Sequence, residues 1–165
     1  MKEEKIEDSL QDHTLDRVDR RILATLQANG RISNQELAST VHLSPAQCNR
    51  RHRRLERLGF VKRYEARLDA DRLGLGVTAF VHITMERGQF KEVLKFQRTI
   101  ERMPEILECH AVTGDFDYVC KVVASDLKSL SNFLLGTLAQ LPGVNGVRSS
   151  ICLNELKCTS ALPLE

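Results

Sequence analysis

The chain has 165 residues, of which 42% are hydrophobic, so it can form one large domain or two small ones with a buried core. No apolar run approaches the roughly 20 residues that span a bilayer, and the polar start MKEEKIEDSLQDH is unlike a signal peptide, so we expect no membrane partner and no export. The net charge of +2 conceals a local cluster, because residues 44–63 carry seven positive charges and one negative (net +6), which leaves −4 for the remainder and indicates contact with a polyanion.

The first predicted helix begins after Asp16 and ends at Asn29-Gly30. Asp16 is suited to cap the helix, and Asp19 places a negative charge in its first turn. Apolar residues recur at helical spacing, namely Val18, Ile22, Leu23 and Leu26. This pattern predicts a short helix that buries one face.

Two more helix starts follow, eleven residues apart. Ser33 and Glu36 form one capping box, and Ser44 and Gln47 form another, with Pro45 at the first helical position. About three residues remain for the turn between the two helices, and Gly59 ends the second helix. A short helix, a tight turn and a longer second helix are typical of a helix-turn-helix.

The pattern changes from about residue 77. Alternating or apolar stretches predict strands at 77–85, 106–112, 117–124 and 147–157, and helices are expected at 90–103 and 127–141. The order is βαββαβ, and M-P-E-I at 103–106 resembles L-P-G-V at 141–144, 38 residues later, as in an internal duplication. Two such halves form a ferredoxin-like sheet with both helices on one face, so the fold class is α+β.

The other face of this sheet is expected to be open and apolar. The residues expected there are Phe80, Ile106 or Leu107, and Ile151 or Cys152. An open apolar face favours pairing with a second copy of the chain. We predict a tail at 1–13, a helix-turn-helix domain at 14–60, a hinge strand and linker at 61–76, the sheet domain at 77–160 and a tail at 161–165.

The second helix of the helix-turn-helix carries the basic cluster. At 100° per residue its apolar stripe consists of Cys48, His52, Leu55 and Leu58. A solvated helix face would normally interleave acidic partners, and only Glu56 is present, so we predict that the opposite side contacts double-stranded DNA. Arg51 lies at the edge of the stripe and is expected to pair with an acid inside the domain. His52 is interpreted as a partly buried histidine with satisfied hydrogen bonds, in preference to a pH sensor.

The predicted DNA-contacting residues divide by position along this helix. Its first turn enters the major groove most deeply, so the base-reading candidates are Ala46, Gln47, Asn49 and Arg50, next to the capping Ser44. The candidates for phosphate contact are Arg53, Arg54, Arg57, Lys62 and Arg63. We expect pseudo-palindromic sites with half-sites about one helical turn apart.

Several stretches in this order resemble the Lrp/AsnC (feast/famine) transcriptional regulators. They are L-D-R-V-D-R-R-I-L at 15–23, G-R-I-S-N-Q-E-L-A at 30–38, L-S-P-A-Q-C at 43–48, R-R-L-E-R-L-G-F-V at 53–61, E-C-H-A-V-T-G-D-F-D-Y at 108–118 and L-P-G-V at 141–144. The resemblance implies a winged-type helix-turn-helix joined to a βαββαβ effector-binding domain. It also implies homodimers, often assembled into octamers, that bind amino acids and control genes of amino-acid metabolism. The implied location is the cytoplasm of a prokaryote, on the nucleoid. His52 departs from the Val or Ile that is usual in this family.

The resemblance places the effector beside the loop T-G-D-F-D-Y. The simpler interpretation is a tight turn between strands, which accounts for Gly114 and Asp115 but not for Asp117. An amino acid needs an acceptor for its ammonium group, which Asp115 or Asp117 supplies, and donors for its carboxylate, which backbone N–H groups of the turn supply. The candidate effector-binding residues are Thr113, Gly114, Asp115, Phe116, Asp117, Tyr118, Ser149 and Ser150.

The main alternative is an enzyme of the sirohaem-decarboxylase type, which has a similar fold. Only His82 and His110 are available in the sheet domain for such a site, and the basic helix would then have no role. The five cysteines are odd in number and form no Cys-x-x-Cys pair, so we expect reduced, mostly buried thiols and no metal. We therefore predict a regulator that is not an enzyme and has no cofactor.

Overall fold

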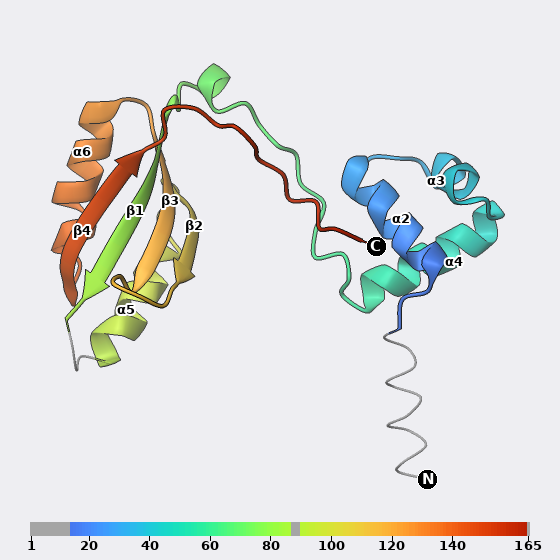
Figure 1. Cartoon of the computed structure of the whole chain (residues 1–165), viewed down its shortest axis with the longest axis horizontal. Coiled ribbons are helices and arrows are strands. Elements are labelled where there is room, and N and C mark those ends of the chain that lie inside the picture. Colours follow the sequence, from blue (N-terminus) through green and yellow to red (C-terminus); the bar gives the residue numbers. More distant parts are fainter. Residues whose placement is uncertain (1–13, 87–89, 165) are drawn as a thin grey trace, which may run out of the picture. The chain divides into compact units, whose positions relative to one another are not determined.

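The computed structural model describes residues 14–86 and 90–164. The chain divides into two compact units, one formed by residues up to Arg67 together with Lys157 onward, the other by Leu68–Leu156 (Figure 1). The fold class is α+β, as predicted, with helices in the first unit and a four-stranded antiparallel sheet with its helices in the second. Among the described residues, no helix combines the length and the apolar character needed to cross a membrane.

The first unit contains helices α2 (Arg17–Ala28), α3 (Asn34–Val41) and α4 (Pro45–Arg57). Each begins at a capping box, since Asp16, Ser33 and Ser44 all accept a hydrogen bond from the backbone N–H three residues later. The core between the helices consists of Ile22, Leu23, Leu26, Leu37, Ala38, Val41, Cys48 and Leu55. The predicted helix starts and apolar faces are therefore confirmed.

Two left-handed residues end the second and third of these helices. His42 has φ 58°, and the N–H of the following Leu43 donates to the carbonyl of Ala38, which turns the chain directly into α4. At the end of α4, Gly59 has φ 77° and Phe60 N–H donates to Leu55 O, in the same closing arrangement. The tight turn of the helix-turn-helix thus depends on a non-glycine residue in the left-handed region.

The second unit has sheet order β2-β3-β1-β4, with strands β1 (Val77–Met85), β2 (Ile106–Ala111), β3 (Tyr118–Ala124) and β4 (Val144–Ile151). Helices α5 (Phe90–Ile100) and α6 (Leu127–Gly136), followed by the 3-10 turn η2 (Leu138–Gln140), pack on one face of it. The buried residues between helices and sheet are Ala79, Val81, Ile83, Phe96, Ile100, Tyr118, Cys120, Val122, Ala124, Leu130, Leu134 and Leu138. This is the predicted ferredoxin-like arrangement.

The face of the sheet without helices carries exposed apolar side chains. Phe80 is 41% exposed, and Leu107, rather than the partly buried Ile106, is exposed beside β3. Ile151 pairs with Ala79, whose side chain is buried under the helices, so Ile151 belongs to the helix-covered face and not to the open one. Of the residues predicted for the open face, Leu107 therefore lies on it in preference to Ile106, and Ile151 does not lie on it.

The hinge strand expected within residues 61–76 is absent from the described chain. Residues 61–69 have no regular secondary structure, and a short 3-10 turn, η1 (Asp71–Leu73), follows. The last strand also differs from expectation, since it spans Val144–Ile151 instead of 147–157. Its partner β1 begins at Val77, so beyond the bond from Cys152 N–H to Thr78 O the described part of the chain offers no strand for β4 to pair with.

The C-terminal segment returns to the first unit, which the sequence did not indicate. Gln27 of α2 exchanges two hydrogen bonds with the backbone of Leu162, donating to its carbonyl at 3.0 Å and accepting from its N–H at 2.6 Å. Leu164 packs against the core of the three helices, and Arg67 donates to the carbonyl of Cys158 at 2.9 Å. Residues 157–164 are therefore part of the helical unit, whereas residues 157–160 were expected to end the sheet domain and residues 161–164 to belong to a separate tail.

Candidate functional site

Helix α4 separates its side chains into a buried and an exposed side. Cys48 and Leu55 are fully buried, and His52 and Leu58 are half-buried beside them, as predicted. The exposed residues on the predicted DNA side are Ala46, Gln47, Arg50, Arg53 and Arg57. All five extend from the same helix.

Two arginines of the cluster are engaged inside the unit. Arg51 donates to Asp16 at 2.7 Å and to Asp19 at 2.8 Å, and Arg54 pairs with the other Asp19 oxygen at 3.2 Å. Asp19 is only 1% exposed, so its charge is neutralised by these two guanidinium groups. The internal pairing predicted for Arg51 is confirmed. Arg54, expected among the phosphate contacts, also fastens α4 to the start of α2.

The pKa values at this junction reflect the same contacts. The pKa of the Asp16 carboxyl is lowered, chiefly because the Asp19 backbone N–H donates to it and also because Arg51 lies beside it, with partial burial opposing the change. The pKa of the Arg51 guanidinium is raised by its hydrogen bonds to Asp19 and then Asp16. Both groups are therefore held in their charged forms.

The first turn of α4 includes two residues whose side chains bond each other. Ser44 Oγ donates to Gln47 Oε1 at 3.1 Å, and Gln47 N–H donates to Ser44 Oγ at 3.3 Å. Reading adenine takes both the oxygen and the NH₂ group of a glutamine amide. The Gln47 oxygen is therefore engaged in the cap, and its NH₂ group is not. Asn49, also a predicted reader, is half-buried.

Beyond the helix, Lys62 and Arg63 are both exposed, and Arg63 pairs with Glu65 at 2.6 Å across the surface. His52 Nε2 lies 2.6 Å from the hydroxyl of Tyr64, which donates to Glu56 at 3.0 Å. Burial and the hydrogen bond to Glu56 raise the pKa of Tyr64 to about 12. The expected satisfied histidine is confirmed, and its partner connects α4 to the segment that follows it.

In the second unit, the loop between β2 and β3 forms a tight turn, as expected. Gly114 has φ 120°, in the region that favours glycine. Asp117 is fixed by its neighbours, since its carboxylate accepts from Met85 N–H at 2.7 Å, its N–H donates to Ile83 O and its carbonyl accepts from Val112 N–H. This acid therefore holds the loop against the end of β1.

A polar cavity of about 470 Å³ lies beside this loop. It is lined by Thr84, Met85, Glu86, Gly114, Asp115, Asp117 and Asn145. Three predicted effector residues, Gly114, Asp115 and Asp117, meet there. The sequence analysis missed the other four lining residues because they lie at the end of β1 and the start of β4, which only the register of these two strands brings to the loop: Thr84, Met85, Glu86 and Asn145.

The other predicted effector residues lie elsewhere. Tyr118 is buried against Phe96, with ring centroids 4.9 Å apart, and its hydroxyl accepts from Gln97. Ser149 lines a separate, mainly apolar cavity of about 330 Å³ beside α6. Ser150 pairs with Phe80 on the open face, and Thr113 is exposed outside the polar cavity.

Phe116 leaves the loop and folds onto the open face of the sheet. Its ring lies 4.7 Å from that of His82, and the guanidinium of Arg148 sits 5.8 Å from its centroid. His110, the other histidine of this domain, is exposed on β2 and lies 3.3 Å from Glu108. His82 is thus occupied by an aromatic contact of the chain itself.

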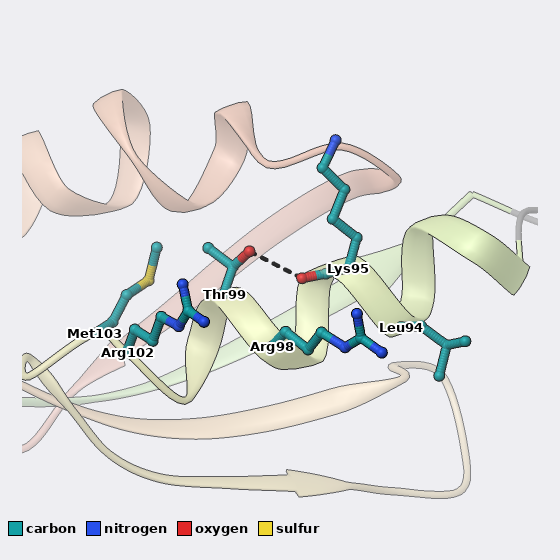
Figure 2. A pocket seen from close by; sticks show the side chains of 6 residues that line it. All are labelled: Leu94, Lys95, Arg98, Thr99, Arg102 and Met103. Atoms are coloured by element: carbon teal, nitrogen blue, oxygen red, sulfur yellow. Dashed lines mark hydrogen bonds between the residues drawn. The ribbon is translucent and has the colours of Figure 1, made fainter.

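A further cavity, of about 600 Å³, lies along α5 and was not predicted (Figure 2). Its lining residues are Leu94, Lys95, Arg98, Thr99, Arg102 and Met103. Figure 2 shows Arg98 and Arg102 extending from one flank of the helix and Lys95 away from them, while the Thr99 hydroxyl donates back to the Lys95 carbonyl at 2.9 Å. The cations lie on the outer side of an amphipathic helix, where solvated charges are common.

Comparison with known proteins connects these two regions to named families. Residues 15–62 match the family described as winged helix-turn-helix DNA-binding, and residues 78–162 match the Lrp/AsnC ligand binding domain. The chain is 43% identical over 151 residues to the leucine-responsive regulatory proteins of Escherichia coli and Salmonella typhimurium, covering 92% of each chain.

Solved structures agree with these matches. A transcriptional regulator from Neisseria meningitidis, crystallised as a complex with L-methionine, superposes with a TM-score of 0.89 at 39% identity, covering 92% of this chain and 97% of that one. An AsnC-family regulator from Agrobacterium tumefaciens gives a TM-score of 0.86 at 31% identity, covering 91% and 97%.

Proposed function

Because the chain belongs to the Lrp/AsnC family of transcriptional regulators, we propose that it couples the binding of a free amino acid to the binding of pseudo-palindromic DNA. It is a DNA-binding transcriptional regulator with a ligand-binding domain. The enzymatic alternative on the same fold is not favoured, since the relatives are named as regulators. One observation carries the proposal: exposed arginines line the outer side of a helix whose inner side is fixed to the rest of its unit.

On DNA, α4 is the recognition helix, and its exposed residues fall into two groups, one that contacts bases and one that contacts phosphates. Arg50, near the N-terminus of the helix, reads a guanine through its fork of N–H groups, and Ala46 packs against a thymine methyl group. Arg53, Arg57, Lys62 and Arg63 neutralise phosphates. Arg54 contributes less to DNA binding than its sequence position indicates, because it is half-buried and paired with Asp19.

Binding curves on an operator and on a scrambled duplex test this division. Arg50→Ala should weaken operator binding by about 1–3 kcal/mol and leave the scrambled duplex little affected. Arg57→Ala is the matched control, which should weaken both duplexes alike and lower the salt dependence of log K by about one unit. Equal losses on both duplexes for Arg50→Ala would remove its base-reading role.

The effector is a free amino acid that binds in the polar cavity beside the β2–β3 loop. Asp117 or Asp115 receives its ammonium group, because carboxylates line this cavity. None of the described lining residues is cationic, so backbone N–H groups of residues 114–116 hold the effector carboxylate. The methionine complex of the Neisseria relative supports an amino acid as the class of ligand.

The active form is a homodimer formed through the open sheet face, with further assembly to an octamer, acting on the nucleoid in the cytoplasm of a prokaryote. Exposed Phe80 and Leu107 support this pairing, since apolar residues on an open sheet face favour a protein partner. The regulated genes are those of amino-acid metabolism. Light scattering of the intact protein, with and without each amino acid, measures the assembly state.

A further inference from the structure

Two cysteines face each other across neighbouring strands of the sheet. Cys109 of β2 pairs with Cys120 of β3 in the antiparallel register, and both are free thiols. The side chain of Cys120 is buried under the helices, and cross-strand partners share a face, so both sulfur atoms lie on the helix side. Periodicity and motifs do not predict this pair, because ten residues and a turn separate its members.

The ladder fixes which kind of pair this is. Val112 N–H donates to Asp117 O at 3.0 Å, which marks Val112 and Asp117 as a hydrogen-bonded pair. Pair types alternate along an antiparallel ladder, so Cys109 and Cys120, three steps away, form a non-hydrogen-bonded pair. In such pairs the Cα atoms are about 4.5 Å apart and the side chains approach most closely. A Cα separation of about 4.5 Å is one that a disulfide can span.

The two thiols already interact and differ in character. A hydrogen bond from Cys120, together with the nearby His110, lowers the pKa of Cys109 to about 7, although burial opposes this change. The bond to Cys109 and burial raise the pKa of Cys120. Cys109 is half-buried and Cys120 has no exposed surface, so an oxidant in solution reaches Cys109 first.

We propose that Cys109 and Cys120 are a peroxide-oxidisable dithiol site, in which Cys109 is the attacking thiol and Cys120 the resolving one. The Cys109 thiolate attacks one oxygen of hydrogen peroxide, the O–O bond breaks, and hydroxide leaves, which gives a sulfenic acid on Cys109. The Cys120 sulfur then attacks the Cys109 sulfur, the S–O bond breaks, and the second hydroxide takes up the Cys120 proton as water. In total two thiols and one peroxide give one disulfide and two waters.

The disulfide would change the spacing of the two strands that flank the β2–β3 loop. Cβ atoms of directly opposite residues are about 4.5–5.5 Å apart in a sheet, but a disulfide brings them to about 3.8 Å. The bridge therefore draws β2 toward β3 just before Val112 and just after Asp117. This site is independent of the proposed amino-acid effector, since it depends only on thiol chemistry and strand register.

Mass spectrometry of the intact chain tests the site. The full-length protein is treated with a small excess of hydrogen peroxide, alkylated under denaturing conditions and digested. We expect one intramolecular disulfide between the Cys109 and Cys120 peptides, reversible by dithiothreitol, in the native protein and in the control variant Cys158→Ser, which removes an exposed thiol. Oxidation that spares Cys109 and Cys120, or that joins other cysteines, would overturn the proposal.

A second measurement covers the possibility that a variant folds poorly. The alkylation rate of Cys109 in the unmutated protein, followed by peptide mass against pH, should reach half its maximum near pH 7. Cys120→Ala should move this midpoint upward, because its hydrogen bond to Cys109 is lost, and should leave Cys109 as a sulfenic acid trapped by dimedone after peroxide. An alkylation midpoint well above pH 7 in the unmutated protein would contradict the assignment of Cys109 as the attacking thiol.

Discussion

Asp19 explains why a dense row of arginines does not act as one surface. Its carboxylate is buried at the start of α2 and binds Arg51 and Arg54 of α4 at 2.8 and 3.2 Å. A buried carboxylate without such partners would lower the stability of the fold. The first role of these two arginines is therefore to neutralise Asp19 and not to bind a ligand. Arg50, Arg53 and Arg57 remain exposed on the same helix.

Exchanging single arginines should separate these two tasks. Arg51→Ala removes the ion pairs of Arg51 with Asp16 and Asp19. We expect it to lower the free energy of unfolding by about 1–3 kcal/mol, because Asp19 then keeps only Arg54 as its charged partner. Arg53→Ala, the neighbouring exposed arginine, should stay within about 0.5 kcal/mol. Urea unfolding followed by circular dichroism gives both values. Equal stability of the two variants would show that Asp19 does not need Arg51.

The charge of Asp117 should matter separately from its bond to the backbone. Asp117→Asn keeps an oxygen that can accept from Met85 N–H but removes the negative charge. The parent protein should be stabilised by its amino acid by about 2.7 kcal/mol at 100 times the dissociation constant. The variant should fold normally and lose most of this effect in a thermal-shift screen of the twenty amino acids. Ser149→Ala, in the separate cavity beside α6, is the control and should keep it.

At the level of elements, the turn between α3 and α4 sets the direction in which α4 leaves α3. His42 is the only non-glycine residue with positive φ among residues 14–86 and 90–164, and Leu43 follows it directly into the core. A left-handed residue with a side chain costs roughly 1–2 kcal/mol, least for residues such as asparagine. The turn therefore tolerates some residues much better than others.

This cost can be measured with two variants at one position. His42→Asn should be close to the parent in stability, whereas His42→Val should be at least about 1 kcal/mol less stable, because β-branched residues disfavour the left-handed region. The side chain of His42 is exposed, so lost packing does not confuse the comparison. Thermal unfolding of both proteins provides the test. A valine variant as stable as the asparagine variant would contradict the role given to the backbone here.

The elements that the sequence predicted best are those with local causes. The three capping boxes join residues three apart, and the apolar faces of α2 and β1 repeat within one element, so both can be found by spacing alone. The end of β4 and the absence of a strand at 61–69 depend instead on whether a neighbouring strand is available. The partners of Asp19 and the residues that complete the polar cavity come from distant parts of the chain, which periodicity does not identify.

At the level of the whole molecule, the C-terminal segment was the largest departure from the sequence-based expectation. Residues 157–164 contain no regular element, and their hydrogen bonds to Gln27 join residues 135 positions apart. Leu164 packs its side chain against the core of the helical unit. No short motif marks such a contact, so only the three-dimensional structure could reveal it.

Two leucines of this segment provide a matched comparison. Leu164→Ala should lower the stability of the helical unit by about 1–2 kcal/mol, since a partly buried side chain is removed. Leu162→Ala should have almost no effect, because its side chain is 70% exposed and it contacts Gln27 through the backbone. Hydrogen exchange of the α2 amides measures both. Faster exchange in the Leu162 variant than in the Leu164 variant would argue against the packing of Leu164.

The course of this segment also affects how genes of such regulators can be recombined. A chimera that takes only the codons for residues 1–67 from one parent receives a DNA-binding module without the leucine and the backbone partner that its own last residues supply. The foreign tail would then have to fit a surface to which it is not matched. An exchange that carries the codons for residues 14–67 and for residues 157–164 together keeps the module whole, although the ligand-binding domain is encoded between them.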